Sequence, residues 1–276
     1  MDVVILGSGS PLPDPERAGP STLVRTSVGD LLFDCGRGVL LRAAAAGSGA
    51  GAVRSVFLTH LHSDHTTDLN DVITTRWITS FSPNPLKVVG PVGTAALVDA
   101  TEAMLATDIG YRLEHHGDLT WRPSTEVTEV SEGVVFEEGP VRVTAAPTDH
   151  APVRPTVGYR VDDAGSSVVI AGDTVPCVGL DALCRGADVL VHTVVRRDVL
   201  EGLGLPRLTD VLDYHSSVPD AAGTAARGGV GTLVLTHLVP APVPGSEGEW
   251  REQAAAVFGG TVVLASDLFS LDVSKV

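Results

Sequence analysis

The chain has 276 residues, 43% of them hydrophobic and 19% charged, and this balance excludes a disordered or low-complexity polypeptide. Nineteen Lys and Arg stand against 34 Asp and Glu, so the formal net charge is -15 and the overall field repels nucleic acids and anionic membranes. The three cysteines show no CxxC spacing, which excludes a disulfide framework and a cysteine-ligated zinc module and favours a reducing compartment.

Strand-like and helix-like segments alternate along the chain in the manner of a single α/β domain. Strands are expected at residues 2–6, 21–27, 30–34, 53–58, 86–89, 157–161, 168–171, 189–191, 232–235, 261–264 and 268–271, with three short ones between 127 and 145. Helices are expected at residues 38–46, 94–106, 180–185, 218–227 and 247–258. With no dividing linker, no signal peptide and no long apolar run, we expect one cytoplasmic domain over residues 1–276, without membrane contact.

Four ligand-type side chains follow the strand predicted at residues 53–58, in the order His60, His62, Asp64 and His65. Imidazole nitrogens and carboxylate oxygens suit zinc and related divalent ions. Residues two apart in a tight turn can point the same way, so His60 and His62 can share one ion while Asp64 and His65 turn toward a second. The alternative is a polar surface loop, but such loops rarely concentrate three histidines in six residues.

Three more residues of the same chemistry stand directly beyond other predicted strands. They are His150, Asp173 and His237. A lone histidine at such a place is more often a capping or core residue. Together with the first cluster, these positions predict one shared metal site.

These strings resemble the metallo-β-lactamase superfamily and, more narrowly, its ribonuclease Z-like branch, over nearly the whole chain. The resemblance implies an α/β fold of the αββα sandwich type, in which two mixed sheets pack face to face with helices outside and the ligands lie at one edge. The matching strings are residues 4–10, 32–36 (LFDCG), 59–65 with Asp68 and Leu69, 149–150, 171–174 (AGDT), 187–192 (ADVLVH), 214–217 (YHSS) and 233–238 (LVLTHL).

The resemblance also implies a dinuclear zinc centre, with Mn²⁺ or Fe as alternatives, and a bridging hydroxide as the nucleophile. It places the first zinc on His60, His62 and His150, the second on Asp64, His65 and His237, and Asp173 between them as a bridge.

The residues expected to act in catalysis are Asp64 and His215. His215 matches the family's HST-type histidine, which would contact the developing oxyanion or protonate the leaving group. From the residues alone His215 could equally begin a helix, because Ser216 and Ser217 could cap the segment that follows.

Two departures from ribonuclease Z stand out. Thr193 occupies the position of the acidic residue in the HEAT-type motif, and the stretch between His150 and Asp173 is too short for the long arm that grips tRNA. With the net charge of -15, these departures argue against tRNA as the substrate. The chain looks closer to the arylsulfatase-type subgroup, through residues 76–77, 86–94, 108–112 and 152–160.

We therefore expect a zinc-dependent hydrolase of a small ester, whether a phosphodiester, an aryl sulfate or a carboxylic ester or lactone. The alternatives are a ribonuclease Z-type or cyclic-nucleotide phosphodiesterase and, in another class, a non-catalytic metal-loaded binding or regulatory protein. The expected partner is a small molecule and not a nucleic acid, with a homodimer as a candidate assembly. Candidate substrate contacts are Trp77, which could instead be core or dimer contact, His116 and Arg154.

Overall fold

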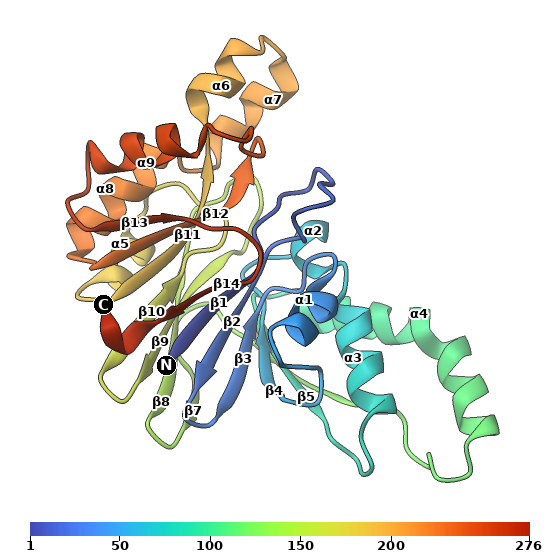
Figure 1. The fold of residues 1–276 in the computed structure, drawn as a ribbon. Coiled ribbons are helices and arrows are strands. Elements are labelled where there is room, and N and C mark those ends of the chain that lie inside the picture. Colours follow the sequence, from blue (N-terminus) through green and yellow to red (C-terminus); the bar gives the residue numbers. More distant parts are fainter.

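The computed structural model describes residues 1–276 as two seven-stranded sheets packed face to face (Figure 1). The first sheet has the order β14 (Phe269–Asp272), β1 (Asp2–Gly7), β2 (Ser21–Thr26), β3 (Gly29–Phe33), β4 (Val53–Phe57), β5 (Leu86–Gly90) and β6 (Thr125–Glu129). The second has the order β13 (Thr261–Leu264), β12 (Thr232–Val239), β11 (Val189–Val195), β10 (Ser166–Ile170), β9 (Val157–Asp163), β8 (Val141–Pro147) and β7 (Gly133–Glu138).

Helices cover the outer face of each sheet. Those of the first half are α1 (Val39–Ala45), α2 (Ser63–Thr66), α3 (Leu69–Ile78) and α4 (Thr94–His115). Those of the second half are α5 (Val178–Cys184), α6 (Arg197–Gly202), α7 (Pro206–Asp210), α8 (Val218–Gly228) and α9 (Glu247–Ala255), with short 3₁₀ turns η1 (Val211–Asp213) and η2 (Val273–Lys275). The predicted αββα sandwich is confirmed.

Alternating side chains of the strands fill three apolar layers. Phe33, Phe57 and Tyr159 meet in the layer between the sheets, where the rings of Phe33 and Phe57 stack with centroids 4.9 Å apart. A second layer lies under α1 and α3, and a third under α5, α8 and α9. Because both faces of the central strands are buried, these strands read as near-continuous apolar runs, whereas the edge strands β6 and β7 are largely exposed.

Three segments differ from the sequence-based expectation. The helix predicted to end at residue 106 continues to His115, supported by an ion pair between Asp108 and Arg112 one turn apart. β12 continues past residue 235 to Val239. The helices α6 and α7 were not predicted, because the glycines Gly202 and Gly204 interrupt the helical pattern there. No helix of the fold combines the length and the apolar character needed to cross a membrane.

Candidate metal centre

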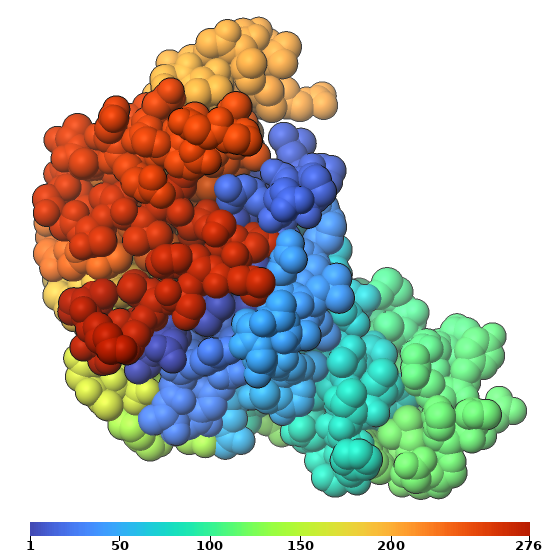
Figure 2. All heavy atoms as spheres, in the orientation of Figure 1, coloured from blue at the N-terminus to red at the C-terminus, as the bar shows by residue number.

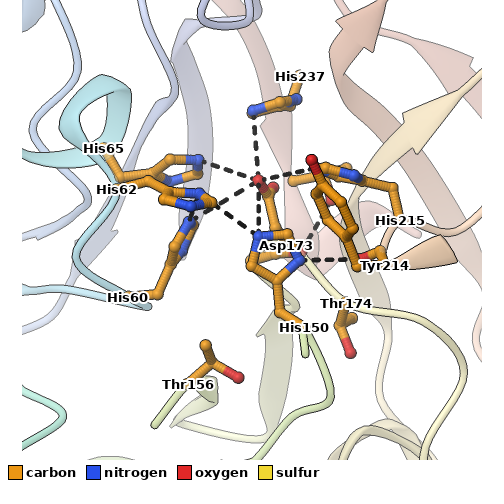
Figure 3. A network of polar contacts seen from close by, with 12 residues as sticks. His60, His62, His65, His150, Thr156, Asp173, Thr174, Tyr214, His215 and His237 are labelled. Atoms are coloured by element: carbon orange, nitrogen blue, oxygen red, sulfur yellow. Dashed lines mark hydrogen bonds and ion pairs between the residues drawn. The ribbon is translucent and has the colours of Figure 1, made fainter. Parts of the chain in front are cut away.

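The ligand-type residues gather at one edge of the sandwich because several strands end there. β3 and β4 run parallel in the first sheet, as β10, β11 and β12 do in the second, so their carboxyl ends share an edge. His60 follows β4, Asp173 follows β10, and His150 follows β8. Figure 3 shows these side chains converging on the Asp173 carboxylate.

His237 reaches the site through an irregularity in its own strand. The pairing of β12 with β11 shifts register between Thr236 and Leu238, and His237 between them has a φ of 48°. A β-bulge of this kind re-aims one side chain, and left-handed backbone is uncommon for a residue other than glycine. The bulge therefore turns the side chain of His237 toward the cluster. In a regular strand the side chains of successive residues would simply point to opposite faces of the sheet.

A first group of ligand atoms comes from His60, His62, His150 and Asp173, and its members all lie within 4.8 Å of one another. His60 Nε2 lies 3.1 Å from His62 Nδ1, which is 3.4 Å from His150 Nε2. Asp173 Oδ2 stands 3.8 Å from His60 Nε2 and 3.9 Å from His150 Nε2. Three imidazoles and a carboxylate in this space are a zinc-type donor set.

The second group is formed by Asp64, His65 and His237, again within 4.8 Å. Asp64 Oδ2 lies 3.2 Å from His237 Nε2 and 3.6 Å from His65 Nε2. Asp173 Oδ2 also approaches this group, at 3.4 Å from His65 Nε2 and 3.5 Å from His237 Nε2. One carboxylate thus stands between both groups of donors.

Hydrogen bonds behind the cluster set which ring nitrogen of each histidine faces it. His65 Nδ1 donates to Asp34 Oδ2 at 2.8 Å, and His150 Nδ1 donates to the Tyr214 carbonyl at 2.8 Å. Asp34 also accepts from the Thr59 amide and hydroxyl, and Thr59 Oγ1 lies 3.0 Å from His60 Nδ1. These bonds leave the opposite Nε2 lone pairs directed inward, as metal ligation requires.

Asp34 is the functional residue that the sequence analysis missed. It is buried, directly follows β3 and has a φ of 59°. The available signal was its position, since it stands one residue beyond an apolar strand, as other ligand-type residues here do. It stands in the LFDCG string, yet only the structure shows it behind His65 and Thr59.

The electrostatics of the site favour neutral rings in the first group of donors, whereas the charges of Asp173 and Asp34 outweigh burial and raise the pKa of His65 well above its ordinary value. Burial lowers the pKa of His60 well below its ordinary value and that of His150 to about 4. Burial alone would raise the pKa of Asp173, but the charges of His237 and His65 and hydrogen bonds outweigh it and hold that pKa well below the ordinary value. Neutral imidazoles and ionised carboxylates are the forms that bind metals.

Three buried atoms of cluster residues, His65 Nε2, Asp173 Oδ1 and His237 Nδ1, have no hydrogen-bond partner in the protein. A buried polar atom without a partner costs free energy unless a ligand satisfies it. The first two of these atoms and the donor set both fit a divalent cation. The predicted ligands therefore lie together as a candidate metal centre.

His215 lies beside the cluster, as Figure 3 shows, with its Nε2 3.2 Å from Asp173 Oδ2. Its Nδ1 donates to the Val211 carbonyl at 2.9 Å, which turns Nε2 toward the cluster. Burial would lower its pKa, but the hydrogen bond to Asp173 and the Asp173 charge outweigh burial and raise it. The helix cap behind it belongs to Ser217, whose side chain forms a capping box with Asp220.

Thr193, at the position where ribonuclease Z has an acidic residue, lies directly behind the Asp173 segment. Its buried hydroxyl donates to the Gly172 carbonyl at 2.9 Å. The bond ties the end of β11 to the turn that presents Asp173. Thr193 therefore has a positioning contact here and no acidic group.

A cavity of about 250 Å³ opens at the cluster. It is lined by Ser10, Pro11, Leu12, His62, Asp64, Asp173, Val195, Arg207, Leu208, Val211, Tyr214, His215, His237 and Val239. None of the three candidate substrate contacts belongs to this lining. Trp77 is 3% exposed and its indole donates to the Trp121 carbonyl, His116 lines a separate pocket with Phe81 and Arg112, and Arg154 is exposed. The sequence gives the position of these three residues along the chain, but it does not show the direction in which their side chains point.

Comparison with known proteins identifies the family. The β-lactamase superfamily domain matches residues 30–238. The chain is 56% identical over 275 residues to ribonuclease Z of Mycobacterium avium (strain 104), covering 99% of this chain and 98% of that protein. It is 54% identical to ribonuclease Z of Mycobacterium marinum, covering 99% of both.

Solved structures agree on the fold. The short form of human tRNase Z superposes with a TM-score of 0.73 at 25% identity, covering 99% of both chains. The metallo-β-lactamase fold protein YhfI of Bacillus subtilis superposes with a TM-score of 0.75 at 24% identity, covering 98% of both chains.

These matches correct the expected substrate. The prediction of a small ester and of no nucleic-acid partner was wrong, because relatives 53–56% identical over the whole chain are named as ribonucleases. The error came from giving weight to Thr193, to the short stretch between His150 and Asp173 and to the net charge of -15. Distant surface charges are screened beyond about 8 Å at physiological salt, so they say little about binding in one cavity. The placement near the arylsulfatase-type subgroup is not confirmed.

The metal-ligand chemistry of the site and the named relatives together show a metal-dependent hydrolase. The chain belongs to the β-lactamase superfamily, in its ribonuclease Z-like branch.

Proposed function

We propose that the protein is a ribonuclease of the Z type, which cleaves precursor tRNA on its 3′ side. The observation that carries this proposal is the cluster of seven donor side chains in a chain 56% identical to a protein named ribonuclease Z. The name of the human structural relative, tRNase Z, supports tRNA as the RNA in question. We place the activity in the cytoplasm, with which the three free cysteines are consistent.

In this proposal two divalent ions occupy the cluster, zinc being favoured by the nitrogen and oxygen donors. His60, His62 and His150 would hold one, Asp64, His65 and His237 the other, and Asp173 would contact both. When bound, the ions would activate water and polarise the scissile phosphodiester. The hydrogen bonds from Asp34 and Thr59 would keep the ligand rings oriented during turnover.

His215 is the residue proposed to handle a proton. Its Nδ1–H is committed to the Val211 carbonyl, so Nε2 is the atom free to donate toward the leaving oxygen or the charge developing on the phosphate.

The test uses protein loaded with zinc and a precursor tRNA with a 3′ extension. We expect cleavage at one site on the 3′ side, mapped by sequencing the product ends. His215→Ala should retain the metal content of the wild type and lose roughly a hundredfold in kcat. Asp173→Ala should lose at least one ion as well as activity. Failure of the metal-loaded wild-type protein to cleave precursor tRNA would overturn the proposal.

A further inference from the structure

A pair of short helices beside the metal cluster spans residues 197–210, which we call the α6–α7 projection. It stands out from the edge of the second sheet (Figure 1). The stretch between His150 and Asp173, where a tRNA-gripping arm would be expected, holds only β9, β10 and short connections. The projection instead lies between β11 and His215, so the chain leads directly from it to the reactive site.

The projection is fixed to the body of the protein and is not a loose loop. Leu200 is buried against Val195 and Leu212, with Leu208 and Val211 packed around them. Figure 2 shows the yellow-orange projection standing above the blue N-terminal loop. Leu208 and Val211 also line the cavity that contains the metal cluster. Its base is therefore held rigidly at the rim of the reactive cavity.

Arg207 on the projection is the only Lys or Arg that lines the cavity. Its side chain is exposed and forms no ion pair or hydrogen bond with any other residue of the protein. The neighbouring arginines are already paired: Arg196 with Asp198 and Glu249, and Arg197 with Glu201. A free guanidinium has therefore been left facing the one cavity where a phosphodiester would react.

We propose that Arg207 binds a phosphate of the RNA next to the scissile one, which makes the α6–α7 projection an RNA-contacting element. This inference rests on the proposed ribonuclease function. A guanidinium binds phosphate through two parallel hydrogen bonds and stays charged at every relevant pH. Arg207 is at the exposed rim and not among the ligands, so it suits the neighbouring phosphate rather than the one at the metal cluster.

The apolar residues that line the cavity near Arg207 suit the ribose or base of a nucleotide. Leu12 on the N-terminal loop is 62% exposed and lines the cavity together with Pro11. Leu208 and Val239 add apolar surface to the same lining. Apolar side chains at this place can cover a ribose or base while the guanidinium holds the phosphate.

The experiment compares Arg207→Ala with the wild type, both loaded with zinc, on two substrates. One is a precursor tRNA, and the other is an activated diester that carries a single phosphate. We expect KM for the precursor to rise about tenfold or more, with kcat changed less, while kcat/KM for the small diester stays within about twofold. The slope of log KM against log salt should fall by roughly 0.7 to 0.9, the contribution of one phosphate contact.

Two control variants separate the contact from net charge and from folding. Arg251→Ala removes the same charge from an exposed, unpaired position on α9 outside the cavity, and should leave KM and the salt slope unchanged. Arg207→Lys keeps the charge and should recover most of the salt slope.

An unchanged KM for the precursor in Arg207→Ala would overturn the inference, as would equal losses on both substrates, which would place Arg207 on the scissile phosphate. If the wild type itself does not cleave the precursor, the proposed function fails before Arg207 is tested.

Discussion

At the scale of single residues, Asp34 orients the rings of His65 and, through Thr59, of His60. One carboxylate accepts three hydrogen bonds, from the Thr59 amide, the Thr59 hydroxyl and His65 Nδ1. Because Thr59 in turn contacts His60, Asp34 lies behind both groups of proposed ligands. A carboxylate in this place fixes the ring tautomer and raises the basicity of the ligating nitrogen.

Asp34→Asn is expected to weaken metal binding by about 10- to 100-fold, the usual effect of losing a partner behind a ligand. The amide nitrogen can face His65 Nδ1 only as a second donor, so the ring would turn or change tautomer. The measurement is a zinc competition titration against a chelator.

Asp163→Asn is the matched control for this substitution. Asp163 is equally buried and accepts from the Ser27 amide and hydroxyl, but it has no contact with the cluster. Its zinc affinity should match that of the wild type. Equal affinities for the two variants would show that Asp34 does not position His65.

His192 gives the fold a predictable response to acid. It is fully buried, its Nε2 has no partner, and burial lowers its pKa from 6.5 to about 4. The unfolded chain therefore takes up a proton on this residue before the folded chain does. The stability from His192 is complete above about pH 6.5 and is lost as the pH falls from 6.5 toward 4.

His192→Leu removes this titration, so the free energy of unfolding should fall less steeply than in the wild type between pH 6.5 and 4. The difference between the two proteins should change by about 2–3 kcal/mol over this range, at 1.36 kcal/mol per unit of pKa. Urea unfolding at several pH values measures it. A constant difference would show that His192 is not kept neutral by the fold.

At the scale of elements, α8 packs against α5 so closely that one contact requires glycine. A Cβ added to Gly228 would lie 2.7 Å from Cys184 Cβ and 2.8 Å from the Cys184 carbonyl oxygen. Gly223 lies in the same helix, and a Cβ there would come no closer than 3.4 Å to the Arg227 guanidinium.

We expect Gly228→Ala to lower the free energy of unfolding by about 1–3 kcal/mol, because the helices must move apart. Gly223→Ala should instead raise it by about 0.5–1 kcal/mol, since alanine favours a helix interior. Chemical denaturation measures both. A loss of similar size in both variants would show that helix propensity and not the contact with α5 controls the effect.

The helices and strands also show how much of the fold and of the site could be predicted from the sequence. Most strand positions followed from β-branched runs, and the motif at residues 60–65 placed the site at strand ends. His237 could be assigned from its position after a strand, but the bulge that turns it inward depends on pairing between β11 and β12. Such register shifts are set by neighbouring strands and leave no mark in a single segment.

The direction of individual side chains was the second feature of the site that could not be predicted from the sequence. Trp77 was expected near the substrate, yet its indole is buried and donates to Trp121. Arg207 could not be singled out, because its helix has only five residues and follows the glycines Gly202 and Gly204. Whether an arginine is paired with a neighbouring acid or left free depends on the tertiary structure, and composition cannot distinguish the two.

At the scale of the whole molecule, the metal cluster joins the two halves of the sandwich. His60, His62, Asp64 and His65 come from the first-sheet half, between β4 and α3, whereas His150, Asp173 and His237 come from the second. Ions bound by all seven would therefore cross-link the sheets at one edge. The net charge of -15 also acts at this scale, where it favours solubility without deciding what binds in the cavity.

Removal of the metal is expected to lower Tm of the whole molecule. A ligand bound only by the folded state and present at about a thousand times its Kd stabilises that state by about 4 kcal/mol. For a chain of this size each kcal/mol shifts Tm by about 2–4 °C, so chelation should lower Tm by roughly 10 °C. Calorimetry before and after chelation, with zinc content measured on each sample, tests this expectation.

Asp173→Ala is the matched comparison. Because this variant lacks the carboxylate that stands between the two groups of donors, its Tm should respond much less to added zinc. A Tm unchanged after the zinc is removed would show that the sheets are held together at this edge without the ions, so that the cluster does not couple metal binding to folding.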